Sequence, residues 1–201
     1  MLFRSGEAGA VISGGGTRAN GIAITTATGN VRIETLTVEG TTSSGIVLSG
    51  GLTSAVVTGC TVKNAGGHGI YATVKSAVIQ YCTVTNCVSY GIYGTGSAQI
   101  IRLNATSGNY RGVSVSGSGT VVEANTITGE KGTGIFASGS STKVTRNTVK
   151  SCAVNGIYIT TGGMMEVSRN TVRGSGSYAI RSYTGTVGGH KIQNNLLIGG
   201  K

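Results

Sequence analysis

The acidic side chains of this chain limit the chemistry that it can perform. The 201 residues include six glutamates and no aspartate. Hydrolysis of a glycosidic bond usually needs two facing carboxyl groups about 5–10 Å apart. Glu34 and Glu123 occupy equivalent positions of an internal repeat, but four repeats separate them along the chain. We therefore expect that these two residues do not form a hydrolytic acid/base pair.

A second kind of sugar chemistry needs fewer acids. β-Elimination beside a uronate carboxylate requires a base that removes a proton and a cation that stabilises the enolate-like intermediate. His68, Tyr71, Tyr90 and Arg111 have side chains suited to these roles, provided that the fold brings them together. A histidine beside a turn glycine is more often an ordinary turn residue. A metal-free polysaccharide lyase is therefore the alternative to a non-catalytic protein, and no metal or cofactor is expected in either case.

Aromatic residues recur at one position of the repeat. This position is expected to face outward, and four of its eight members are aromatic, although the chain has ten Phe and Tyr in all. A strip of rings can stack sugars, seal a subunit interface or stabilise a sheet by cross-strand contacts. The candidate ligand-binding or interface residues are Tyr71, Tyr93, Phe136, Tyr158, Tyr178 and Arg181.

Basic residues exceed acidic ones by ten, which favours an acidic partner. Four cations fall close together in two successive repeats: Arg146, Lys150, Arg169 and Arg173. Like charges one repeat apart repel each other, so these residues are candidates for binding an anion, with solvated surface charge as the simpler interpretation. Nucleic acid is disfavoured as the partner because no recognised binding motif accompanies the charge.

The elements that position these side chains follow from the repeat. A Gly-aliphatic pair recurs with spacings of 24, 24, 22, 21, 22, 22 and 23 residues. Its members are Gly21-Ile22, Gly45-Ile46, Gly69-Ile70, Gly91-Ile92, Gly112-Val113, Gly134-Ile135, Gly156-Ile157 and, in degenerate form, Ala179-Ile180. A second signal, aliphatic-x-x-Asn-x-aliphatic, has the same period, as in Val144 to Val149.

This repeat predicts an all-β fold. Ile and Val greatly outnumber Leu, and β-branched residues favour strands. A unit of about 22 residues with short β-branched strands fits one coil of a parallel β-solenoid, here of about eight coils. Leucine-rich repeats have a similar period but need a leucine framework that this chain lacks.

The two signals resemble the repeats of the right-handed parallel β-helix proteins of the pectate-lyase-like superfamily. That resemblance implies the fold, which occurs in polysaccharide lyases and hydrolases, sugar-binding surface proteins and phage tailspikes. Gly67-His68-Gly69 also resembles an element of the polygalacturonases in this superfamily. The aspartates on which that family's hydrolysis depends are missing. The Asp-rich calcium site of the superfamily's lyases also has no counterpart here, which disfavours calcium-assisted lyase chemistry.

Stacked coils place equivalent residues in columns. Asn104, Asn125, Asn147, Asn170 and Asn195 are expected to form an amide ladder at one corner. Cys60 and Cys82 fall in the same column, where buried thiols are expected and a disulfide between the two is left open.

The chain is expected to hold one domain, with residues 21–201 as the β-helix and residues 1–20 as a partial coil or assembly contact. No secretory signal follows Met1, and no apolar run is long enough to span a membrane, so membrane insertion is not expected.

These features favour a non-catalytic structural or surface-recognition module, such as a tailspike stem, a virion-associated protein or a cell-surface adhesin. Its expected partners are copies of itself or a larger assembly, and an acidic polysaccharide. The sequence leaves its location open, with a virion or cell surface as one option for a protein that is part of an assembly.

Overall fold

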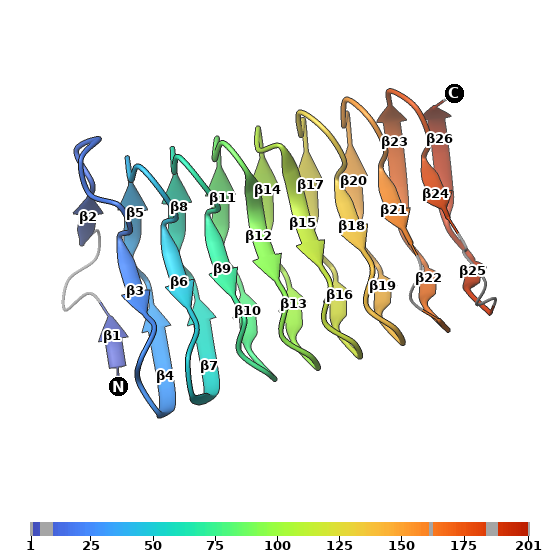
Figure 1. Ribbon diagram of the computed structural model, residues 1–201. Coiled ribbons are helices and arrows are strands. Elements are labelled where there is room, and N and C mark those ends of the chain that lie inside the picture. Colours follow the sequence, from blue (N-terminus) through green and yellow to red (C-terminus); the bar gives the residue numbers. More distant parts are fainter. Residues whose placement is uncertain (1, 5–9, 161–162, 184–188, 201) are drawn as a thin grey trace.

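The computed structural model describes residues 2–4, 10–160, 163–183 and 189–200. The chain winds around one axis in successive coils, and three parallel sheets run along that axis (Figure 1). No helix occurs in these ranges. Part of the expected N-terminal partial coil, residues 1 and 5–9, lies outside the described residues.

Each coil contributes one short strand to each sheet. Sheet A contains β1 (Leu2–Arg4), β4 (Gly29–Glu34), β7 (Leu52–Thr58), β10 (Val78–Gln80), β13 (Ile100–Arg102), β16 (Val121–Glu123), β19 (Lys143–Thr145), β22 (Glu166–Ser168) and β25 (Lys191–Gln193). Sheet B contains β2 (Val11–Ser13), β5 (Thr37–Glu39), β8 (Thr61–Lys63), β11 (Thr83–Thr85), β14 (Ala105–Ser107), β17 (Thr126–Thr128), β20 (Thr148–Lys150), β23 (Thr171–Ser175) and β26 (Leu196–Gly200). Sheet C contains β3 (Ile22–Ile24), β6 (Ile46–Leu48), β9 (Ile70–Ala72), β12 (Tyr90–Gly94), β15 (Arg111–Val115), β18 (Ile135–Ala137), β21 (Ile157–Ile159) and β24 (Ile180–Ser182).

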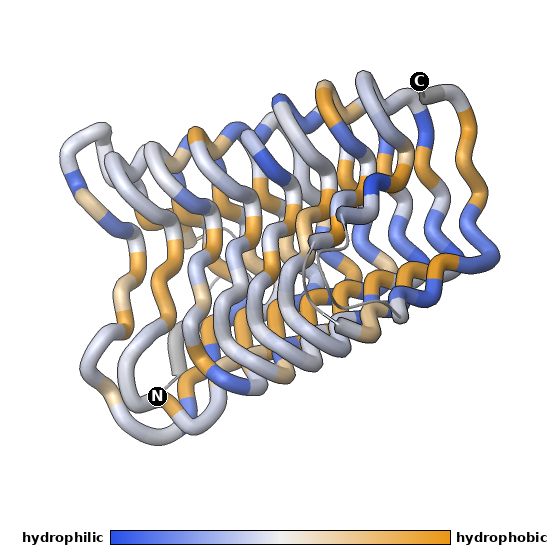
Figure 2. Tube along the Cα trace, turned by 45° about the vertical axis from the view of Figure 1, so that its right-hand side comes forward, coloured by the Kyte–Doolittle hydropathy of each residue, from blue (hydrophilic) through white to orange (hydrophobic). Residues whose placement is uncertain are grey.

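The sequence prediction of a parallel β-solenoid with about eight coils is confirmed. The repeat registers also agree, because Ile135 pairs with Val113 on one side and Ile157 on the other. Inward aliphatic side chains of all three sheets form one continuous core. Figure 2 shows hydrophobic positions, in orange, recurring from coil to coil along the axis. Burial of their side chains removes apolar surface from water.

A steric constraint explains why each Gly-aliphatic pair begins with glycine. A Cβ atom on Gly134 would lie 2.7 Å from the carbonyl oxygen of Gly156 in the next coil and 2.6 Å from Cγ1 of Val149. Any side chain at this position would therefore push two coils apart. Ala179 is the exception in the repeat, and it precedes β24, the last described strand of sheet C.

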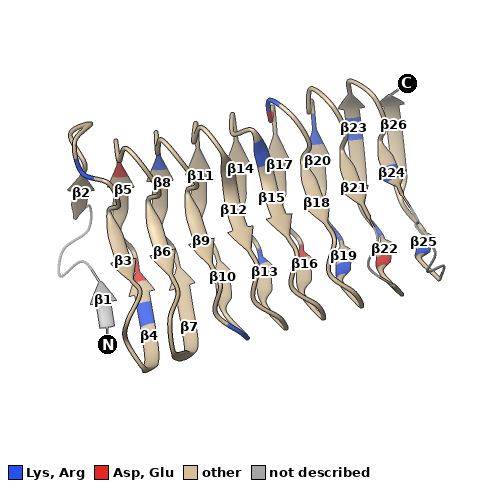
Figure 3. Cartoon of the chain, viewed as in Figure 1, with Lys and Arg blue, Asp and Glu red and all other residues tan. Residues whose placement is uncertain are grey.

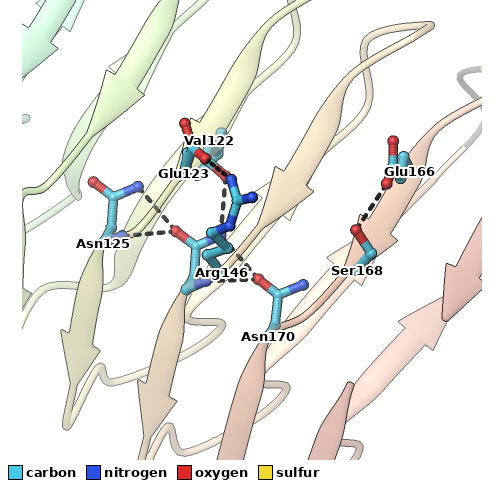
Figure 4. A network of polar contacts seen from close by, with 8 residues as sticks. Val122, Glu123, Asn125, Arg146, Glu166, Ser168 and Asn170 are labelled. Carbon is cyan, nitrogen blue, oxygen red and sulfur yellow. Dashed lines mark hydrogen bonds and ion pairs between the residues drawn. The ribbon is translucent and has the colours of Figure 1, made fainter. Parts of the chain in front are cut away.

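The corner between sheets A and B combines a left-handed residue with an asparagine. Arg146 has φ 58° and is followed by Asn147, whose Oδ1 accepts hydrogen bonds from the backbone N–H of Asn125 (2.9 Å) and from its Nδ2 (3.0 Å). Nδ2 of Asn147 donates to the carbonyl oxygen of Val122 at 2.9 Å and to Oδ1 of Asn170 at 3.0 Å. Figure 4 shows these bonds running from coil to coil. The expected amide ladder is therefore present, from Asn104 to Asn195.

Cysteine continues this column toward the N-terminus. The thiols of Cys60 and Cys82 approach the carbonyl oxygens of Ile33 and Val57 at 3.8 Å, where the asparagines donate from Nδ2. Cys60, Cys82, Cys87 and Cys152 are all buried and free, so the disulfide left open by the sequence is not formed.

Candidate functional site

The outer face of sheet C carries a continuous row of rings and guanidinium groups, which we call the aromatic ribbon. Strand pairing aligns Tyr71 with Tyr93, and Phe136 with Tyr158 and then Arg181. Residues that precede or begin these strands complete the row. The ribbon consists of His68, Tyr71, Tyr90, Tyr93, Tyr110, Arg111, Phe136, Tyr158, Tyr178 and Arg181.

The N-terminal half of the ribbon is a cluster of packed rings. Tyr71 and Tyr93 are stacked, with their ring centroids 5.2 Å apart. Tyr90 and Tyr93 meet edge to face, with their centroids 5.1 Å apart. The His68 ring lies about equally close to both, 4.9 Å from Tyr93 and 5.0 Å from Tyr90. Such contacts fix ring orientations and leave a broad apolar surface with hydroxyl groups at its margin.

Arg111 joins this cluster to the C-terminal half of the ribbon. Position 114 pairs with Tyr93 on one side and Phe136 on the other, so its column predicts an outward ring. The residue there is a serine, and Ser114 is buried. The Arg111 guanidinium lies over the Phe136 ring at 4.2 Å and over the Tyr90 ring at 5.1 Å. The long side chain thus spans the gap that a small residue leaves, which sequence register alone does not reveal.

The C-terminal half places an aromatic pair beside a second cation. Phe136 and Tyr158 meet edge to face, with their centroids 5.5 Å apart. The guanidinium of Arg181 lies 5.0 Å from the Tyr158 centroid and 5.7 Å from that of Tyr178. Each arginine is therefore held in place by rings through cation–π contacts.

The four residues of the lyase alternative do come together, but His68 is poorly prepared to act as a base. The backbone N–H of Tyr90 donates to Nδ1 of His68 at 3.3 Å. Burial lowers the pKa of His68, so the neutral ring is favoured. A neutral ring whose Nδ1 accepts carries its proton on Nε2, which leaves Nε2 as a donor. Burial also raises the pKa of Tyr93, with the neighbouring tyrosines adding to the shift, so the neutral phenol is favoured there too.

The described carboxylates lie away from the ribbon. Of the described glutamates, Glu34, Glu123 and Glu166 belong to sheet A and Glu39 to sheet B, while Glu130 lies at the corner before sheet C. Glu34 and Glu123 share one column at four coil steps, as the sequence predicted. They form ion pairs with Arg32 and Arg146, respectively. Neither ion pair lies at the aromatic ribbon.

The four clustered cations separate into two groups. Arg146 pairs with Glu123, and Arg169 lies at the next equivalent corner with φ 58°. Lys150 and Arg173 pair in register on sheet B. Because the left-handed corner turns the chain from one sheet to the next, residues four apart in sequence face different directions. Figure 3 shows Lys and Arg residues, in blue, on strands and turns of the C-terminal half.

One buried acid was missed by the sequence interpretation. Glu130 is 1% exposed, and it accepts hydrogen bonds from the Thr106 hydroxyl and from the backbone N–H of Asn109, both at 2.7 Å. It belongs to a second corner column, which mixes several residue types. That column follows the asparagine column at a constant offset of five residues: Thr41, Ala65, Cys87, Asn109, Glu130, Cys152 and Ser175. The constant offset is the signal that could have revealed it.

Within residues 2–4, 10–160, 163–183 and 189–200, no three His, Cys, Asp or Glu side chains come together as a metal-binding group. No helix of these ranges has the length and hydropathy to cross a membrane.

Several solved structures share this architecture. The A-module of the mannuronan C-5 epimerase AlgE4 from Azotobacter vinelandii superposes with a TM-score of 0.69 at 14% identity, covering 86% of this chain and 61% of that one. The periplasmic alginate epimerase AlgG superposes with a TM-score of 0.57 at 12% identity, covering 86% of this chain and 60% of its own. This chain thus spans about three-fifths of either structure, and the likeness is one of fold. No curated protein matches.

The family model agrees with the observed coils. A model described as the right-handed beta helix region matches residues 4–105 and 53–197, which together include nearly all the strands. The solved structures above share the same solenoid. The chain therefore belongs to the right-handed β-helix family.

Proposed function

We propose that the protein is a non-catalytic recognition module that binds an acidic polysaccharide along the aromatic ribbon. The observation that carries this proposal is the ribbon itself, a continuous row of rings on sheet C that contains two arginines and no described carboxylate. Aromatic faces suit the apolar faces of sugar rings, and arginines suit their carboxylates. A net charge of +10 adds long-range attraction for a polyanion.

The fold of the solved structures guides the choice of ligand. Two of them are a mannuronan C-5 epimerase and a periplasmic alginate epimerase. Alginate is therefore the first polymer to test, followed by polygalacturonate. A role as a tailspike stem, virion protein or adhesin would use the same ribbon for recognition at a surface, and self-association through the ribbon is the competing use of these rings.

Replacing both Tyr93 and Tyr158 with serine should weaken alginate binding about tenfold or more, because rigid aromatic anchors contribute disproportionately to binding. The two rings lie in opposite halves of the ribbon, so the change removes contact area from both. Isothermal titration calorimetry measures the affinity, and circular dichroism checks the fold.

The matched control replaces two exposed tyrosines outside the ribbon, Tyr81 and Tyr183, each 57% exposed. It should bind alginate as the parent does. Equal affinity of parent and ribbon variant would contradict the proposal. A change in light-scattering mass with no glycan binding would instead assign the ribbon to contacts between copies.

The lyase alternative is favoured by one observation, the convergence of His68, Tyr71, Tyr90 and Arg111. We expect no enzymatic cleavage, because the His68 ring offers a donor rather than a base. Incubation with alginate or polygalacturonate should produce no rise in ultraviolet absorbance from an unsaturated uronate. A rise that disappears in His68→Ala, but persists in Glu34→Gln and Glu123→Gln, would establish the lyase and overturn the non-catalytic assignment.

A further inference from the structure

The two arginines of the ribbon carry charges that no described ion pair neutralises. Arg111 and Arg181 are cations on the outer face of sheet C, and neither is among the described ion pairs. Those pairs use Arg32, Lys63 and Arg146 on the other two sheets. Rings hold a guanidinium in position, but they do not neutralise it.

The two guanidinium groups approach one ring pair from opposite ends. Arg111 begins β15 and extends toward the following coil, where it covers Phe136 at 4.2 Å. Arg181 lies in β24 and extends back to the preceding coil, where it covers Tyr158 at 5.0 Å. Phe136 and Tyr158 are themselves in contact across β18 and β21. The result is an edge-to-face aromatic pair, with its ring planes 77° apart, and a cation at each end.

We infer that Arg111 and Arg181 form a clamp that binds two carboxylates of a single acidic glycan, whose sugar rings lie on Phe136 and Tyr158. This inference rests on the proposed function, and it assigns the charged part of the ligand to the C-terminal half of the ribbon. The ligand class is a polymer with a carboxylate on each of several sugars. A glycan with one acidic group can satisfy one end of the clamp.

The N-terminal half of the ribbon provides the contrast. His68, Tyr71, Tyr90 and Tyr93 pack against one another, and Arg111 is the sole guanidinium described over any of these rings. The neutral histidine adds no charge there. This half is suited to sugar faces and hydroxyls, so the ribbon as a whole distinguishes a charged end from an uncharged one.

The test compares alginate oligosaccharides of increasing length with the same oligosaccharides after chemical reduction of their carboxyl groups. Arg111→Ala and Arg181→Ala should each weaken binding of long acidic oligosaccharides about tenfold, and leave the already weaker binding of the reduced oligosaccharides unchanged. The double variant should lose about a hundredfold on long oligosaccharides. On an oligosaccharide too short to reach both ends, each single variant should lose little, because the other arginine still binds it, and the double variant should lose about tenfold.

A matched control separates the clamp from net charge. Lys75→Ala and Lys143→Ala remove two exposed cations that belong neither to the ribbon nor to the candidate anion-binding residues, and they lower the net charge by the same amount. They should change affinity little at physiological salt, because screening weakens the effect of distant exposed charges. Arg111→Lys should recover a part of the binding, since lysine keeps the charge but loses the planar stacking on Phe136.

The outcomes distinguish this inference from the proposed function. If the parent protein binds neither alginate nor polygalacturonate, the proposed function fails. If the parent binds alginate but the arginine variants bind equally well, or lose the same factor on oligosaccharides of every length and on reduced ones, the clamp alone is wrong.

Discussion

Replacing Asn147 with leucine should lower the free energy of unfolding by about 4 kcal/mol. The change leaves the N–H and Nδ2 of Asn125 without their acceptor and the carbonyl of Val122 without its donor, all at a buried corner. Each buried polar group that loses its partner costs about 1–3 kcal/mol. Urea unfolding followed by circular dichroism measures the difference, and amide exchange at Asn125 should speed up.

The column itself supplies the control for this variant. Leu36 occupies the equivalent position near the N-terminus and is 7% exposed, so the corner can accommodate a leucine side chain. The cost at Asn147 then reflects lost hydrogen bonds more than crowding. Asn147→Cys should cost clearly less than the leucine variant, since Cys60 and Cys82 direct their thiols at equivalent carbonyls. Equal costs for cysteine and leucine would show that a thiol at this corner does not replace the amide hydrogen bonds. A cost below about 1 kcal/mol for the leucine variant would show that these bonds contribute little.

The sequence was sufficient for the fold because each coil repeats the same steric requirements. A glycine is needed where Gly134 meets the carbonyl of Gly156, and an aliphatic residue is needed at the next, inward position. Asparagine is favoured after a left-handed residue such as Arg146, where its amide bonds two coils at once. These demands recur at the coil period, so a single sequence displays the glycine seven times and the asparagine five times.

The site was less predictable because it depends on side-chain direction. The register placed Tyr71, Tyr93, Phe136 and Tyr158 in one outward column, as the strand pairs confirm. It could not show that Arg111 crosses the gap at Ser114, since a long flexible side chain has many rotamers.

The second corner was hidden for a different reason. Its members, among them Asn109, Glu130 and Cys152, share no residue type. What they share is a buried position after a left-handed residue, occupied by Gly108, Gly129 and Ser151, respectively. Spacing, rather than residue identity, is the property that the corner conserves from coil to coil.

Glu130 at this corner makes the stability of the coil stack depend on pH. Burial is the main cause that raises the pKa of Glu130 from 4.5 to about 7, and it outweighs the hydrogen bonds from Thr106 and Asn109, which lower the pKa. The folded protein therefore binds this proton more tightly than the unfolded chain. The neutral Glu130 therefore contributes a stabilisation that is complete below pH 4.5 and is lost as the pH rises through about 7. The total change in the free energy of unfolding is about 3 kcal/mol. His68 has the opposite effect in part of this range, since its lowered pKa favours the neutral ring in the folded state.

Glu130→Gln should remove this pH dependence, because an amide can donate to the Thr106 oxygen and accept from the Asn109 N–H without carrying a charge. The two proteins should have similar free energies of unfolding at pH 4.5, and the glutamine variant should be more stable by up to about 3 kcal/mol at pH 8. Urea unfolding of both proteins at a series of pH values measures the difference, in which the His68 contribution cancels. A second variant, Thr106→Val, removes a hydrogen bond that lowers the pKa of Glu130, so it should move the loss of stability to higher pH. Parallel stability curves for Glu130→Gln and the parent would show instead that the carboxylate is accommodated in the corner without cost.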